Sequence, residues 1–151
     1  MRLWRISNHA NLSGDGGLYA SGRWRTRGRR VVYLADHPAS ALLETMVHLE
    51  IDAEDLPTDY QLLGIDVPDD IAVTTLTGLP NDWREQIDWT RARGNAWLRG
   101  NEGALLRVPS AIVPNAENYL LNPAHPDARR ITLDSAVRAA FDPRLMAFLE
   151  S

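Results

Sequence analysis

The 151-residue chain contains no cysteine and no lysine, so all 16 of its basic residues are arginine. The absence of cysteine excludes a disulfide framework, a thiolate nucleophile and a cysteine-ligated zinc or iron–sulfur site. The absence of lysine excludes Schiff-base catalysis, the phosphate-binding lysine of a P-loop and the strand lysine of a kinase. An ordinary enzyme of nucleoside triphosphates is therefore disfavoured, whatever genomic bias removed the lysines.

Long apolar runs are also missing, because no stretch approaches the roughly 20 residues that a membrane span needs. The first residues have no apolar segment of the secretory kind, so we expect a cytoplasmic protein that contacts no membrane. With 44% hydrophobic and 24% charged residues, residues 1–151 are expected to form a single soluble domain. The net charge of −4 argues against a dedicated nucleic-acid binder, although five arginines crowd into residues 23–30.

Hydropathy patterns predict a chain in which strands outnumber helices. Strands are expected at 3–6, 31–34, 60–67, 71–76, 104–113 and 130–133, helices at 37–50 and 82–98, and a closing helical turn at 143–149. Residues 7–30 and 115–127 are expected to form loops, and Gly94 should weaken the second helix. The mixed order of elements and the lack of a GxGxxG fingerprint argue against a Rossmann fold. They favour a compact α+β domain with a mixed sheet.

The helix expected at 37–50 carries a polar ridge beside its apolar face. Asp36 is its expected N-cap, and Ser40, Glu44 and His48 recur every four residues along it. Spacing alone favours a solvated Glu44 that pairs with His48 over a catalytic Glu44.

A glycine-rich segment, GGLYASGRWRTRGRR, is the most informative of the expected loops. Arg23 lies there between Gly22 and Trp24, where its planar guanidinium could clamp an anion or a ribose. Composition alone favours an exposed arginine hairpin instead, and nucleic-acid binding is a further interpretation of the same arginines.

Other signals of catalysis are weak. The four histidines show no metal-ligand spacing, so no metal site is expected. The chain has no GxSxG elbow, which argues against an α/β-hydrolase. Ser110 follows Pro109 in a strand-like run and, on composition, is most simply a residue of a β-bulge.

Five segments, in order along the chain, resemble RES-domain proteins, the toxin halves of many bacterial toxin–antitoxin pairs. They read LWRI, GLYASGRW, VVYLADHPASALLE, LLRVPSAIVPNAENYLLNPAHPD and FDPRL, and together they span nearly the whole chain. The family takes its name from arginine, glutamate and serine, which match Arg23, Glu44 and Ser110 here.

The resemblance implies a compact α+β fold similar to the NAD-binding core of mono-ADP-ribosyltransferases of the diphtheria-toxin type. It implies an enzyme that consumes NAD⁺ as a substrate, with no true cofactor, by breaking the nicotinamide–ribose bond. The implied partner is an antitoxin with a helix-turn-helix domain, through which an oligomer forms, and no direct DNA binding by this chain is expected. Matches to catalytic positions are Arg23, Glu44 and Ser110, and matches to NAD-binding positions are Arg5, Tyr19, Arg23, Tyr33, Ser110 and Asn118.

These residue types suit cleavage through an oxocarbenium-like ribose. Arg23 is expected to clamp the dinucleotide, the Tyr33 ring to stack on nicotinamide, and Glu44 to stabilise the developing positive charge. Ser110 is expected to orient nicotinamide or Glu44, and no relay of His and Asp makes it a nucleophile.

Departures from the family pattern surround the expected clamp. The chain has SGRWR, with Ser21 and Arg25, where the family more often has GGRWN. Asn95 stands where an aspartate often follows the glycine of the second helix. These changes bear on substrate affinity more than on reaction type. The arginines beyond Arg23 are expected to form a solvated rim: Arg25, Arg27, Arg29 and Arg30.

The residues do not specify the acceptor of ADP-ribose. Water makes the enzyme a glycohydrolase, phosphate a phosphorylase, and a protein side chain a mono-ADP-ribosyltransferase. Degradation of free NAD⁺ is favoured, because a chain this short leaves little surface for recognising a protein substrate. The alternatives are modification of a cellular protein and, in a different class, a non-enzymatic module that binds nucleic acid or the antitoxin.

Overall fold

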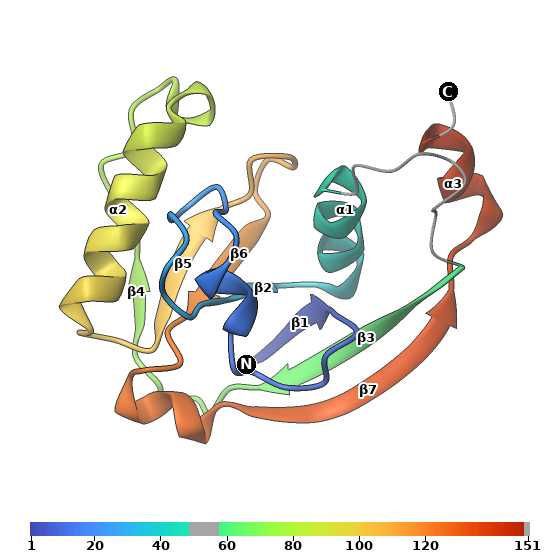
Figure 1. Ribbon diagram of the computed structural model, residues 1–151, viewed down its shortest axis with the longest axis horizontal. Coiled ribbons are helices and arrows are strands. Elements are labelled where there is room, and N and C mark those ends of the chain that lie inside the picture. Colours follow the sequence, from blue (N-terminus) through green and yellow to red (C-terminus); the bar gives the residue numbers. More distant parts are fainter. Residues whose placement is uncertain (49–57, 150–151) are drawn as a thin grey trace.

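The computed structural model describes residues 1–48 and 58–149, which fold around a seven-stranded sheet (Figure 1). The strands are β1 (Arg2–Ile6), β2 (Val32–Ala35), β3 (Asp59–Asp66), β4 (Val73–Thr75), β5 (Leu105–Pro109), β6 (Glu117–Leu121) and β7 (Thr132–Ala140). The helices are α1 (Pro38–His48), α2 (Ile87–Gly100) and α3 (Pro143–Leu149), with 3₁₀ turns η1 (Asp15–Leu18), η3 (Trp83–Glu85) and η4 (Pro126–Arg130). The predicted α+β class is confirmed. No helix in this part of the chain has the length and apolarity to cross a membrane.

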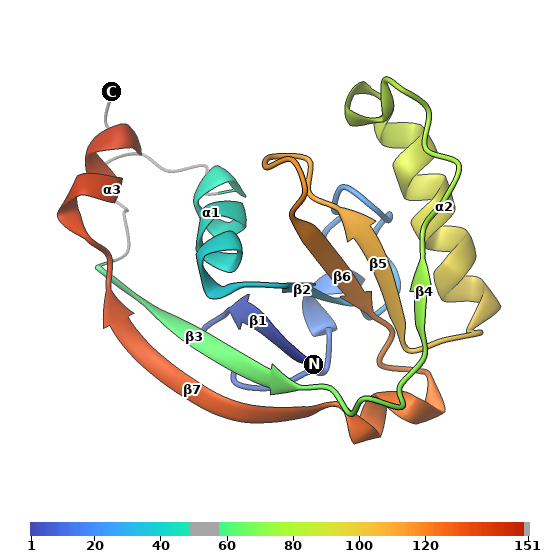
Figure 2. The same ribbon diagram turned by 180° about the vertical axis from the view of Figure 1, so that it is seen from behind.

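The sheet is mixed, with the strand order β4-β5-β6-β2-β1-β3-β7. Strands β4 and β5 run parallel, and the other described pairs are antiparallel. Helix α2 lies beside β4 and β5 at one end of the sheet, whereas β3 and β7 form a long curved pair at the other end (Figures 1 and 2). Helix α1 packs on β1 and β2 near the middle of the sheet.

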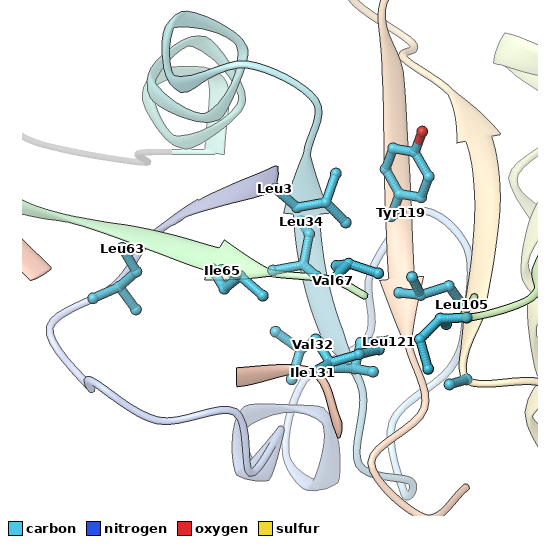
Figure 3. Packing of buried hydrophobic residues seen from close by; sticks show 12 residues of the cluster. Leu3, Val32, Leu34, Leu63, Ile65, Val67, Leu105, Tyr119, Leu121 and Ile131 are labelled. Atoms are coloured by element: carbon cyan, nitrogen blue, oxygen red, sulfur yellow. The ribbon is translucent and has the colours of Figure 1, made fainter. Parts of the chain in front are cut away.

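Two apolar clusters form the core. The first gathers 12 buried residues, and Figure 3 shows them spread along the sheet from Leu63 at one end to Leu105 at the other. The second surrounds Trp24 and Trp83, whose rings stack with their centroids 5.6 Å apart. Burial of each large apolar side chain contributes about 1.5–3 kcal/mol to folding. Because Trp24 belongs to the arginine-rich segment, the second cluster anchors that segment in the core.

The first turn of α1 is capped by His37, so the prediction of Asp36 as the N-cap is wrong. Nδ1 of His37 accepts a hydrogen bond from the N–H of Ala39 at 3.1 Å. The Asp36 carboxylate instead accepts from the N–H of Glu117 on β6, also at 3.1 Å. It therefore joins the start of the helix to a neighbouring strand. Residues 49–50, predicted to continue the helix, lie outside the described residues.

The helix predicted at 82–98 divides into η3 and α2, and α2 runs through Gly94 without interruption. Helix α2 continues to Gly100 and ends at Asn101, which adopts a left-handed conformation (φ 49°). A Cβ at position 94 would overlap the carbonyl oxygen of Trp24. Glycine is therefore required here by the close approach of another segment.

Three predictions for the C-terminal half of the chain need correction. The loop predicted at 115–127 contains β6, whose Tyr119, Leu120 and Leu121 are all at most 4% exposed. Successive residues of a strand point to opposite faces of the sheet, and here Tyr119 and Leu121 belong to the first apolar cluster and Leu120 to the second. Both faces of β6 are therefore covered, and no polar alternation marks it. Strand β5 ends at Pro109, well before the predicted residue 113. Strand β7 extends to Ala140, far beyond the predicted 130–133. The prediction stopped short because the small and polar residues of this edge strand show no alternation of polar and apolar residues.

Candidate active site

A cleft of about 670 Å³ opens between α1, the strands β1, β2 and β6, and residues 21–25. This volume lies within the range of roughly 300–1,000 Å³ that is usual for small-molecule sites. Several of the residues nominated from the sequence line it, and they come from well-separated parts of the chain: Arg5, Arg23, Tyr33, Glu44 and Asn118.

One side of the cleft, the carboxylate side, carries Glu44 and Asn118 on its surface, with Ser110 buried directly behind Glu44. Oε1 of Glu44 accepts a hydrogen bond from Oγ of Ser110 at 2.9 Å and another from Nδ2 of Asn118 at 2.8 Å. The three residues come from α1, the end of β5 and β6, so the sheet and one helix fix the carboxylate from two directions. No described residue donates a hydrogen bond to Oε2, which leaves this oxygen available to a ligand.

Ser110 is itself fixed in place. Its side chain is buried (3% exposed), and its hydroxyl oxygen accepts the N–H groups of Ile112 and Val113, both at 3.1 Å. The single hydroxyl proton is directed to Glu44. This arrangement suits a residue that orients the carboxylate.

His48 does not pair with the Glu44 carboxylate, so the solvated Glu44–His48 pair that spacing favoured is wrong. Nδ1 of His48 lies 2.6 Å from the main-chain carbonyl oxygen of Glu44, one helical turn earlier. The Glu44 side chain points to β5 and β6 instead.

The opposite side of the cleft, the arginine side, is the tight turn from Gly22 to Arg25. The N–H of Gly22 donates to the carbonyl of Arg25 at 3.0 Å and closes the turn. At the tip, the Arg23 guanidinium donates to the carbonyl of Arg84 at 3.1 Å and lies 5.9 Å from the centroid of the Trp83 ring. Arg23 is half-buried and pairs with no carboxylate among the described residues, so it retains donors for a ligand.

Helix α2 holds this turn, which the sequence did not predict. Thr90 donates to the carbonyl of Arg23 at 2.6 Å, and Nε of Arg91 donates to the carbonyl of Gly22 at 2.9 Å. Asn95 makes two hydrogen bonds to Thr26, one to its N–H and one to its hydroxyl. The glycine at position 94 was the one sequence signal of this close contact.

Arg25 is buried, so its assignment to a solvated rim is wrong. Only 4% of the residue is exposed, and its guanidinium donates to the carbonyls of Gly17 and Thr26 at 2.8 and 3.3 Å. It also lies 5.8 Å from the centroid of the Tyr33 ring. The remaining members of the expected rim are exposed, as predicted: Arg27, Arg29 and Arg30.

Arg5 and Tyr33 form the floor between the two sides. The Arg5 guanidinium donates to the main-chain carbonyl of Tyr33 at 3.2 Å, and its Nε has no partner among the described residues. Burial lowers the pKa of Arg5. Burial also raises the pKa of the Tyr33 phenol, an effect that Arg25 partly offsets. The floor thus presents a flat, protonated phenol ring beside a positive charge.

Tyr19 lies apart from the other nominated residues. Its side chain is 78% exposed, and it is not among the residues that line the cleft. Within residues 1–48 and 58–149, no three His, Asp or Glu side chains come together in a way that could hold a metal ion.

Comparison with known proteins gives matches of three kinds: a family model, curated relatives and a solved structure. The RES domain family model matches residues 2–142. A "Toxin Res" of Pseudomonas putida is 52% identical over 129 residues, covering 85% of this chain and 89% of that protein. A "Prs ADP-ribosylating toxin" of a Sphingobium strain is 38% identical over 160 residues, covering 95% and 96%. The crystal structure of the M. tuberculosis MbcT–MbcA toxin–antitoxin complex contains a similar fold, with a TM-score of 0.71 at 21% identity, covering 98% of this chain and 87% of that one.

Proposed function

The chain belongs to the RES-domain family, and from this premise we propose that it is a toxin that cleaves the bond between nicotinamide and ribose in NAD⁺. The observation that carries the proposal is the Glu44 carboxylate, which Ser110 and Asn118 hold at one side of a cleft whose other side carries arginine. A fixed carboxylate facing a cation-lined cleft suits a reaction in which positive charge moves onto a sugar bound through its phosphates.

The reaction needs few groups from the protein. The bond between the ribose C1″ and the nicotinamide nitrogen breaks, its electron pair goes to the ring, and nicotinamide leaves as a neutral molecule. The positive charge passes to the ribose as an oxocarbenium ion, which Oε2 of Glu44 is placed to stabilise. An acceptor then attacks C1″ and releases a proton: water gives ADP-ribose, and phosphate gives its 1″-phosphate. No general acid is needed, because the leaving group carries its positive charge from the start.

The arginines and Tyr33 are assigned to binding. Arg23 and Arg5 would contact phosphate or ribose oxygens, since a guanidinium offers paired donors that match them. The Tyr33 ring would supply the surface on which nicotinamide stacks. Tyr19, nominated from the resemblance, has no place in this scheme, because it does not line the cleft.

A second candidate is the transfer of ADP-ribose to a protein side chain. It is favoured by the Sphingobium relative, whose name describes an ADP-ribosylating toxin and which matches 95% of this chain. Both candidates share the cleavage step and differ in the acceptor. The toxin–antitoxin complex found as a structural neighbour supports an antitoxin as partner, and we assign to that partner the helix-turn-helix domain and the assembly of the oligomer.

The experiment that tests the proposal measures nicotinamide release from NAD⁺ by the purified protein, freed of any antitoxin. We expect release by the wild type and a fall in kcat of about a hundredfold or more in Glu44→Gln, because a transition-state electrostatic contact is lost. The matched control is Glu102→Gln, an exposed residue beyond the C-terminus of α2, which should retain full activity.

The product identifies the acceptor. Mass spectrometry after reactions with and without phosphate distinguishes ADP-ribose from its 1″-phosphate, and a mass gain on added cellular protein marks transfer. Equal release by the wild type and Glu44→Gln would remove Glu44 from catalysis. The absence of release under all three conditions would overturn the proposed function.

A further inference from the structure

The turn that carries Arg23 rests on α2 along its whole length. Thr90 donates to the carbonyl of Arg23 at 2.6 Å, and Arg91 donates to the adjoining carbonyl of Gly22 at 2.9 Å. Asn95, one helical turn further along α2, accepts from the N–H of Thr26 at 3.0 Å and donates to its hydroxyl at 3.1 Å. Three residues of a single helix therefore hold the chain at Gly22, at Arg23 and at Thr26, from the start of the turn to just beyond its end.

Thr90 is the most deeply placed of the three. It is completely buried, and its hydroxyl lies 2.6 Å from the carbonyl oxygen of Arg23 and 3.0 Å from that of Ile87 in its own helix. A threonine hydroxyl within a helix ordinarily bonds to a carbonyl of the preceding turn of that helix. Here the shorter contact crosses to the turn, so the single hydroxyl proton serves Arg23.

The contact between α2 and the turn has no room for adjustment. A Cβ at Gly94 would overlap the carbonyl oxygen of Trp24, and the Trp24 ring is buried against Trp83. The main chain on either side of Trp24 is therefore pressed against the helix. The Arg23 side chain leaves this fixed main chain and is steadied at its far end by the Arg84 carbonyl and the Trp83 ring.

We infer that α2 sets the position of the substrate-binding arginine before substrate arrives, with Thr90 as the positioning residue for Arg23 and Asn95 as a second one. Neither residue lines the cleft, so both act through the turn. A guanidinium that is already in place loses less conformational freedom on binding, which strengthens binding without changing the chemical step. The inference rests on the proposed function for its kinetic part only.

The first test compares Thr90→Val with Thr90→Ser. Valine keeps the shape and removes the hydrogen bond, whereas serine keeps the hydroxyl. We expect Thr90→Val to raise the KM for NAD⁺ by roughly threefold to tenfold with kcat nearly unchanged, the effect of losing one buried hydrogen bond to a binding group. Thr90→Ser should restore most of the affinity. The matched control is Thr75→Val, which removes a hydroxyl that accepts from Arg107 on β5, away from the turn.

The second test needs no substrate. Hydrogen exchange at the amides of residues 22–26 should be faster in Thr90→Val than in the wild type, while exchange in β5 and β6 stays the same. If Thr90→Val does not fold, Asn95→Leu against Asn95→Asp makes the same comparison, since aspartate can still accept from both the N–H and the hydroxyl of Thr26.

The two proposals fail in different ways. Unchanged exchange at residues 22–26 in the folded Thr90→Val variant, or in Asn95→Leu where that variant replaces it, would overturn the positioning role, whether or not NAD⁺ is cleaved. A fall in kcat with an unchanged KM would also overturn it. Absence of nicotinamide release by the wild type would overturn the proposed function and leave the exchange result as the measure of the positioning role.

Discussion

The two sides of the cleft are held in different ways. On the carboxylate side, Glu44 accepts hydrogen bonds from Ser110 and Asn118, so the candidate catalytic side chains hold one another. On the arginine side, the groups that are held are main-chain carbonyls, and Thr90 and Arg91 of α2 hold them. The carboxylate side is thus fixed by candidate catalytic and binding residues, and the arginine side by residues of α2 that do not line the cleft.

This difference has a kinetic counterpart. Stabilisation that appears only in the transition state changes kcat, whereas binding that is equal in the ground and transition states changes KM. If the carboxylate side acts on the developing charge and the arginine side on the bound dinucleotide, damage to the two sides should affect different constants.

After Glu44→Gln on the carboxylate side, Arg23→Ala on the arginine side has the largest expected effect. We expect the KM for NAD⁺ to rise roughly tenfold to a hundredfold with kcat within about twofold, because a charge-assisted hydrogen bond contributes about 1.5–3 kcal/mol. Steady-state kinetics of nicotinamide release measures both constants. The matched control is Arg27→Ala, an exposed arginine just beyond the turn, which should leave both constants unchanged.

One outcome for Arg23→Ala would contradict the proposed division between the two sides. A fall in kcat at unchanged KM would place Arg23 with the groups that act in the transition state. The proposed separation of the two sides would then be wrong.

Ser110→Ala, on the carboxylate side, should change kcat and leave the KM almost unchanged, the reverse of Arg23→Ala. It removes the hydroxyl that donates to Glu44 and leaves the N–H groups of Ile112 and Val113 without their acceptor. We expect kcat to fall roughly fivefold to tenfold while the KM changes little, because the carboxylate keeps its second donor, Asn118, and its orientation is only loosened.

The control for Ser110→Ala is Ser135→Ala on β7, where the serine hydroxyl accepts from Arg2 outside the cleft. Thermal unfolding of both variants separates lost stability from lost orientation. A rise in the KM for NAD⁺ without a change in kcat would assign Ser110 to substrate binding alone.

The sequence predicted the class of the fold, because its apolar runs mark most strands and both longer helices. It did not predict β6, because a strand whose two faces are both buried in apolar clusters shows no alternation of polar and apolar residues. That strand carries Asn118 and brings it beside Glu44, which is 74 residues away in the sequence. Ser110, the other residue that bonds to Glu44, is 66 residues away from it. Only the family resemblance joins these three residues at the level of the sequence, since spacing cannot relate residues on separate elements.

The arginine side was harder to predict for a physical reason. The carbonyls of Gly22 and Arg23 that α2 holds are main-chain atoms, which are the same in every residue and leave no sequence pattern. Nothing in the sequence distinguishes Arg25 from the exposed arginines beside it, although its guanidinium is buried and donates to the carbonyls of Gly17 and Thr26. Gly94 alone signalled the contact, because a glycine inside a helix often marks the close approach of another segment.

The smallest expected effect comes from an ion pair that lies outside both sides of the cleft and tests whether general stability affects them. Arg130 donates to both carboxylate oxygens of Asp70, at 2.6 and 2.7 Å, which lowers the pKa of Asp70. An acid whose pKa is lowered on folding stabilises the fold above its unfolded pKa of about 3.9, and this stabilisation is lost as the pH falls through the folded pKa. Asp70→Asn should therefore lower Tm by about 1 °C at neutral pH, match the wild type in acid, and leave KM and kcat unchanged. A change in either constant would mean that the two sides respond to general destabilisation, and the division between them would not hold.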